Sequence, residues 1–252
     1  MANDLSVKVL IGCCAITYDE LGFVPSLLKL VQEWDGKNPL VFHPRWRRPL
    51  HLGEKECVEY ALADGFTHIL LLEDDTTNIP DGALHRLLSW NKGVVGAYVY
   101  SRHFPHNPNV FLKQNCEVGW LEGEPQAPIY VMPNGGLRKV DMLPFQFTLI
   151  NLEVFQAINK PWFWYGRSGS TDTWFADKCF NAGIDLWCDT DLIVQHAGLD
   201  GSTVGFEVWK KQLSAYSGGT WNPRSSVPLC QFVGLKCTVE GDENVFSKMP
   251  SM

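Results

Sequence analysis

Three consecutive carboxylates, Glu73-Asp74-Asp75, directly follow the apolar residues 69–72. A run this apolar predicts an interior strand of a parallel sheet, and such sheets bind ligands beyond the carboxyl ends of their strands. Adjacent carboxylates repel one another unless a cation lies among them, and Mg²⁺ and Mn²⁺ prefer carboxylate oxygens. The spacing therefore predicts a divalent-cation site that could share a diphosphate as a further ligand. A solvated acidic turn is the alternative.

Two residues far downstream could complete such a site. His196 ends the β-like residues 192–196 and could supply an imidazole to the same metal, although a single histidine is more often structural or exposed. Asp172 lies in the first turn of a predicted helix that Ser170 could cap, and the helix dipole favours an acid there whatever its function. Each residue is weak evidence unless the fold brings it to the acidic strand end.

The elements that must position these residues alternate along the chain. Strands are predicted at residues 7–12, 39–42, 68–72 and 93–100, with helices between them at residues 25–34, 53–63 and 80–90. This alternation is typical of a parallel sheet with crossover helices. Residues 101–134 predict loops and a small antiparallel excursion. Beyond them, residues 137–151, 185–188 and 192–196 are strand-like, while residues 152–158 and 170–182 are helical.

Composition narrows the class of protein. With 252 residues, 45% of them hydrophobic, the chain can bury a substantial core. The formal net charge of −7 argues against a nucleic-acid partner. None of the eight cysteines forms a C-x-x-C pair, no signal-peptide layout is present, and no apolar run suits a membrane span. We expect a cytoplasmic protein (host cytoplasm if viral), with one domain at residues 1–200 and a C-terminal extension at 201–252 that includes a possible helix near 206–216.

Four stretches together resemble the GT-A glycosyltransferases, especially the compact family-2-like enzymes of bacteria and bacteriophages. They are KVLIGCCAITYDELGFVPSLLKL, GFTHILLLEDDTTNIPDGALHRLL, GVVGAYVYSR, and VDMLPFQFTLINLEVF followed by STDTWFADKCFNAGIDLWCDTDLIVQHAG. The resemblance implies an α/β fold of GT-A (Rossmann-like) type. In that fold a mostly parallel central sheet is flanked by helices and carries a small antiparallel section on the acceptor side.

The resemblance also implies roles at the acidic strand end. Asp75 and His196 match the family's metal ligands for Mn²⁺ or Mg²⁺, with Glu73 as a further ligand. Glu73 or Asp74 would face the ribose or a metal-bound water. Glu73 stands where relatives have Asp, and Gln146 stands where they have a small Gly.

Away from the metal, Asp172 matches the general base of inverting members, next to Thr171 where many relatives have Glu. Gly12 and Cys13 would lie beside the nucleotide base. Lys55, in a Glu54-Lys55 pair that replaces an Arg-Asn pair of relatives, would contact the nucleotide phosphate, unless Arg47 or Arg48 does so.

The implied reaction is metal-dependent transfer of a sugar from a UDP-, GDP- or dTDP-linked donor to a glycan or other acceptor hydroxyl. Aromatic rings near Asp172, namely Trp162, Trp164 and Tyr165, could form an acceptor platform beside loop 166–169, as could Trp120; core packing is the alternative. A nucleotidyltransferase is disfavoured because no Gly-rich basic loop follows the first strand. The other open interpretation is a catalytically inactive nucleotide- or glycan-binding module, such as a structural protein of a virion.

Overall fold

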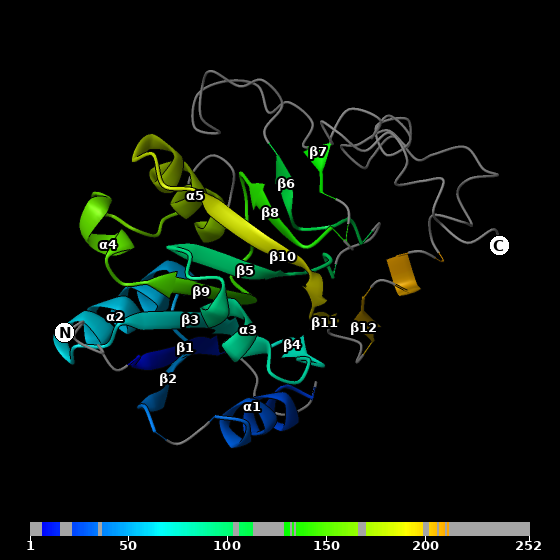
Figure 1. Cartoon of the computed structure of the whole chain (residues 1–252), viewed down its shortest axis with the longest axis horizontal. Coiled ribbons are helices and arrows are strands. Elements are labelled where there is room, and N and C mark those ends of the chain that lie inside the picture. The colour runs from blue at the N-terminus through cyan, green and yellow to red at the C-terminus, as the bar shows by residue number, and fades with distance from the viewer. Residues whose placement is uncertain are drawn as a thin grey trace.

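The computed structural model describes residues 7–15, 22–34, 37–102, 106–112, 129–131, 133, 135–165, 170–198, 202–205, 207–209 and 211. Its centre is a seven-stranded sheet with the order β2-β1-β3-β9-β5-β10-β8 (Figure 1). The strands are β1 (Val9–Ala15), β2 (Leu40–Trp46), β3 (His68–Glu73), β5 (Val94–Tyr98), β8 (Leu137–Val140), β9 (Phe147–Asn151) and β10 (Leu186–Ile193). Strands β1, β2, β3, β5 and β10 run in one direction, whereas β8 and β9 are antiparallel to their neighbours. The predicted mixed α/β class with a mostly parallel sheet is confirmed.

Helices cover both faces of this sheet. Helices α2 (Leu50–Ala63), α4 (Val154–Ala157) and α5 (Thr171–Asn181) contribute to one hydrophobic core, and α1 (Phe23–Gln32) and α3 (Ala83–Ser89) to the other. Successive side chains of a strand point to opposite faces, so Ile69 and Leu71 enter the first core while Leu70 and Leu72 enter the second. Burial on both sides explains why this run is apolar throughout.

A small sheet lies where β3 and β10 end (Figure 1). Strand β11 (Gln195–Ala197) follows β10 and pairs antiparallel with both β4 (Thr76–Thr77) and β12 (Thr203–Val204). His196 is paired with Thr76, so the end of β10 is joined to the acidic turn that follows β3. Strands β6 (Phe111–Leu112) and β7 (Ile129–Tyr130) form a separate antiparallel pair.

The structure differs from the predicted elements in two places. The strand-like residues 137–151 form two strands, β8 and β9, and β9 inserts antiparallel between β3 and β5. The two short strands predicted at 185–188 and 192–196 are instead the long strand β10 followed by β11, because the polar residues Asp189 and Thr190 are buried rather than in a turn.

The start of the expected C-terminal extension belongs to the core. Val204 and Trp209 are buried, and the ring of Trp209 lies 5.5 Å from that of Tyr100. Most of the helix predicted near 206–216 lies outside the described residues, and residues 212–252 lie entirely outside them. The boundary at residue 200 therefore stays a prediction. Among the described residues no helix is both long and apolar enough to cross a membrane.

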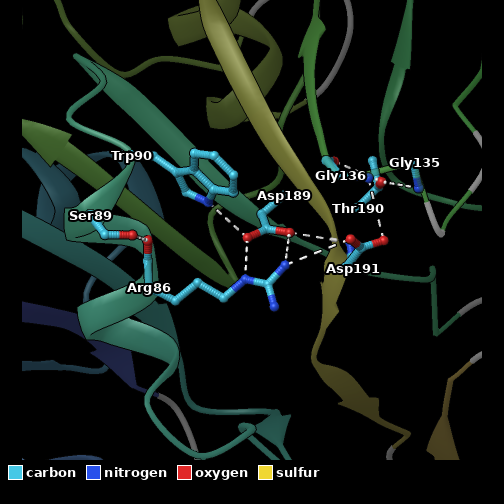
Figure 2. Close-up of polar contacts among 8 residues, drawn as sticks. All are labelled: Arg86, Ser89, Trp90, Gly135, Gly136, Asp189, Thr190 and Asp191. Carbon is cyan, nitrogen blue, oxygen red and sulfur yellow. Dashed lines mark hydrogen bonds and ion pairs between the residues drawn. The ribbon is translucent and has the colours of Figure 1, made fainter.

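An ion pair between the buried Asp189 and the partly exposed Arg86 fixes β10 to α3 (Figure 2). The carboxylate of Asp189 is fully buried and accepts hydrogen bonds from Nε and Nη2 of Arg86, the second at 2.7 Å, and from Nε1 of Trp90 at 2.8 Å. The neighbouring Thr190 hydroxyl accepts from the Gly135 amide and donates to the Gly136 carbonyl, both at 2.8 Å. Burial alone would raise the pKa of Asp189, but the hydrogen bonds from Arg86 and Trp90 outweigh it and hold the pKa below its ordinary value.

We expect Arg86→Met to lower the free energy of unfolding by about 1–3 kcal/mol at pH 7, because the buried carboxylate of Asp189 loses its charged donor. Because the pKa of Asp189 is lower in the folded protein than in the unfolded chain, the ion pair stabilises the fold fully above about pH 4. This stabilisation is lost as the pH falls through the pKa of Asp189 in the folded protein. Urea denaturation should therefore show the two proteins converging in acid. Lys139→Met, which removes an exposed ion pair to Asp185, is the control and should cost at most about 0.5 kcal/mol. Equal stability of wild type and Arg86→Met at pH 7 would show that the ion pair between Arg86 and Asp189 does not stabilise the fold.

Candidate functional site

The structure brings together Glu73, Asp75 and His196. One potential ligand atom from each lies within 4.8 Å of the others. Glu73 ends β3, Asp75 lies in the turn that follows, and His196 comes from β11. The backbone N–H of Ala197 donates to the carbonyl oxygen of Asp75 at 2.8 Å, which ties the two segments together. Two carboxylates and one imidazole form a donor set that suits a divalent metal ion.

The imidazole of His196 is oriented for metal binding. Its Nδ1 lies 3.1 Å from the carbonyl oxygen of Tyr100, and because a carbonyl oxygen only accepts, Nδ1 must carry the hydrogen. Its Nε2 faces Oδ2 of Asp75 at 2.9 Å. Two lone pairs cannot face each other at that distance without a proton or a cation between them. Metal-binding histidines are typically held in this way, with the second ring nitrogen donating to a backbone carbonyl or carboxylate.

Gln146 holds the Glu73 side chain. The side-chain Nε2 of Gln146 donates to Oε2 of Glu73 at 2.7 Å, and the backbone carbonyl oxygen of Gln146 accepts from the Thr76 hydroxyl at 2.9 Å. Gln146 therefore positions the Glu73 carboxylate. Burial, followed by the charges of Asp75 and Asp172, raises the pKa of Glu73 well above its ordinary value.

The two carboxylate oxygens of Asp75 differ sharply. Oδ2 accepts from Nη1 of Arg102 at 2.6 Å in addition to its contact with His196. Oδ1 is buried and has no hydrogen-bond partner within the part of the chain that the structure describes. An orphaned buried carboxylate oxygen is costly, and a cation would satisfy it. The residues present therefore fit a metal ion.

Arg102 was not identified from the sequence. The rule that identified Glu73 to Asp75, that functional groups follow buried parallel strands, points to Arg102 when applied to the strand predicted at 93–100.

Asp172 starts α5 and is partly exposed. Its Oδ1 accepts from the Ser170 hydroxyl and from the backbone N–H of Thr173, the latter at 2.7 Å. Burial raises the pKa of Asp172, although these two hydrogen bonds oppose the shift. Asp172 is close enough to Glu73 to raise that residue's pKa. The structure thus brings Asp172 near the acidic site, and its role as base stays a prediction.

Glu54 is a second residue that sequence reasoning missed as a site residue. It is 2% exposed on α2, and its Oε1 accepts from the Thr171 hydroxyl at 2.8 Å, while Oε2 is buried without a partner among the described residues. Burial raises its pKa well above the ordinary value, the hydrogen bond from Thr171 opposes the shift, and the charges of Glu73 and Asp172 add to it. The Thr171 hydroxyl therefore joins α5 to α2.

The remaining predicted residues lie around this centre. Asp74 is buried in the turn between β3 and β4. Gly12 lies inside β1 under α2, where a Cβ would be 3.0 Å from Cβ of Cys57, so close helix packing explains the glycine. Cys13 is fully buried, and Lys55 pairs with Glu59 at 3.7 Å on α2. Nucleotide contacts of Gly12, Cys13 and Lys55 stay predictions.

The aromatic residues divide by exposure. Trp162 is 6% exposed and donates to the Phe155 carbonyl at 3.1 Å, as expected of core packing. Trp164 and Tyr165 are half-exposed and contact the His51 ring edge-on. Trp120 and loop 166–169 lie outside the described residues.

We expect the protein to bind a divalent cation, which calorimetric titration with Mn²⁺ would measure. Asp75→Ala should abolish binding, whereas Asp64→Ala, at the opposite end of β3, should leave it unchanged. Affinity should rise with pH, because burial and the neighbouring carboxylates raise the pKa of Glu73 and the cation must displace the proton that Glu73 holds. Unchanged Mn²⁺ binding by Asp75→Ala would rule out this site.

Comparison with known proteins supports the fold. No known protein-family profile matches the chain, and no curated protein matches it. Among solved structures, the crystal structure of A197 from STIV is similar with a TM-score of 0.50 at 15% identity, over 79% of this chain and 94% of that one. Apo UDP-glucose pyrophosphorylase gives a TM-score of 0.38 at 10% identity, over 76% and 68% of the two chains, which is too weak to support an argument. The chain is a mixed α/β protein with a mostly parallel central sheet, and it carries a candidate acidic metal site.

Proposed function

We propose that this protein is a metal-dependent glycosyltransferase of the GT-A type. It transfers a sugar from a nucleoside-diphosphate donor to an acceptor hydroxyl, with Glu73, Asp75 and His196 holding Mn²⁺ or Mg²⁺. The catalytic domain is residues 1–200, with residues 201–252 as an extension, in a cytoplasmic protein.

One observation carries this proposal. A carboxylate that follows an interior parallel strand meets an imidazole from a segment far along the chain, and the imidazole is oriented for ligation by the carbonyl of Tyr100. Parallel sheets bind nucleotides at this edge, and a hard cation there would be shared with a diphosphate. The resemblance of the sequence stretches to GT-A enzymes is the reason for proposing that the transferred group is a sugar.

The residues have separate roles in the transfer. Asp172 accepts the proton of the acceptor hydroxyl as its oxygen bonds to the anomeric carbon, and the bond from that carbon to the diphosphate breaks, giving inversion. Such base assistance contributes roughly 10²–10⁴ in rate. Gln146 keeps the Glu73 carboxylate in place. The metal, when bound, supplies Lewis-acid stabilisation of the departing diphosphate.

Thermal shift with UDP-, GDP- and dTDP-sugars tests the donor. A true donor at about 100 times its Kd should stabilise the fold by about 2.7 kcal/mol, and only when Mn²⁺ is present. Asp75→Ala should lose this stabilisation and Asp64→Ala should keep it. If none of the donors stabilises the wild-type protein with Mn²⁺, the proposed function is wrong.

Asp172→Asn should keep donor binding and lose turnover, because the amide retains the side-chain shape but cannot accept the hydroxyl proton. The expected loss is about 10²–10⁴ in kcat with an unchanged donor Kd. Donor hydrolysis or transfer by wild type and variant measures it. Asp177→Asn, on the same helix, is the matched control and should leave kcat unchanged.

A second candidate function is a nucleotide- or glycan-binding module without catalysis. The observation that favours it is the engagement of Asp172 Oδ1 by Ser170 and Thr173, which is what a helix-start residue does without any catalytic role. Donor binding by a wild-type protein that turns over no acceptor, with Asp172→Asn equal to wild type, would select this function.

A further inference from the structure

Arg102 occupies an unexpected place at the acidic site. Its Nη1 donates to Oδ2 of Asp75 at 2.6 Å, and that oxygen is also the one facing Nε2 of His196. The Arg102 side chain is 34% exposed, whereas that of Asp75 is 11% exposed. A buried carboxylate is thus paired with a guanidinium whose other side reaches solvent.

Backbone hydrogen bonds hold the residues that directly precede Arg102. Tyr100, two residues earlier, supplies the carbonyl that orients His196. The Ser101 N–H donates to the Asn107 carbonyl at 2.8 Å, and the Asn109 N–H donates to the Val99 carbonyl at 2.9 Å. The backbone is therefore held while the long side chain of Arg102 can change partner.

A metal ion and the guanidinium compete for the same oxygen. A cation between Asp75 Oδ2 and His196 Nε2 would lie next to the positive charge of Arg102, and like charges at such short range repel strongly. In the metal-free protein the charge of Arg102 offsets that of the Asp75 carboxylate, which it contacts at 2.6 Å. Once a divalent cation takes over that offset, the guanidinium loses its partner.

We propose that Arg102 is an exchangeable counter-ion, which neutralises Asp75 in the metal-free protein and moves to the donor diphosphate when a divalent cation binds. A planar guanidinium binds phosphate oxygens in a bidentate manner, and this residue lies at the sheet edge where the diphosphate is expected. The inference rests on the proposed function and names the residue that recognises the diphosphate, in place of Lys55.

Binding measurements on Arg102→Met separate this role from a structural one. With Mn²⁺ alone, calorimetry should show affinity about 3–10-fold tighter than wild type, because a competing charge is gone. With saturating Mn²⁺, binding of UDP, GDP or dTDP, whichever the wild type binds best, should weaken about tenfold or more. A side chain that only supports the fold would weaken both.

Two further variants sharpen the result. Arg102→Lys keeps the charge without the planar fork, so Mn²⁺ affinity should stay near wild type while nucleoside diphosphate binding falls between the two. Lys92→Met, at the amino end of β5, removes the same charge far from the site and should change neither affinity.

The outcomes distinguish the inference from the proposed function. If wild type binds Mn²⁺ and a nucleoside diphosphate but Arg102→Met shifts both affinities in the same direction, or neither, only the counter-ion role is overturned. If wild type binds Mn²⁺ but none of the three nucleoside diphosphates, the proposed function is overturned together with the inference.

Discussion

The pairing of β11 with β4 is the contact on which the candidate site depends. Asp75 and His196 are 121 positions apart in the sequence, and they meet because the backbone of Ala197 binds the carbonyl of Asp75 while His196 is paired with Thr76. This pairing requires that β10 ends level with β4, because β11 follows β10 directly. The ion pair between the buried Asp189 and Arg86 fixes that strand to α3 (Figure 2), so a contact remote from the site supports its geometry.

Carboxylates dominate the site and make it costly without a bound cation. Burial raises the pKa of both Glu73 and Glu54, which means that their charged forms are less stable in the folded protein than in water. Their cost to stability therefore grows as the pH rises above the ordinary carboxyl range. A fold that keeps such groups together at one sheet edge retains them for a reason other than stability, as functional sites commonly do.

The fold was predictable where the sequence signal is local. Residues 69–72 are apolar because alternate side chains enter two cores, and the carboxylates after them lie at the sheet edge as expected. The meeting of Asp75 and His196 followed from the family resemblance, not from either residue alone. The antiparallel insertion of β9 was not predictable, since its pairing with β3 and β5 is set by tertiary contacts. Gln146, which directly precedes β9, was for this reason not identified as the partner of Glu73. No local sequence pattern predicts that Arg102 contacts Asp75.

The absence of a side chain at Gly12 has an effect that reaches across the molecule. The glycine lets Cys57 settle against β1, and this sets how deeply α2 seats on the sheet. Three residues before Cys57 on the same helix, Glu54 binds Thr171 at the beginning of α5. The distance between β1 and α2 therefore affects the position of α5, the helix that carries Asp172. Gly12 thus keeps α2 close to the sheet, and the methyl group of an alanine at this position would shift the Asp172 carboxylate without contacting it.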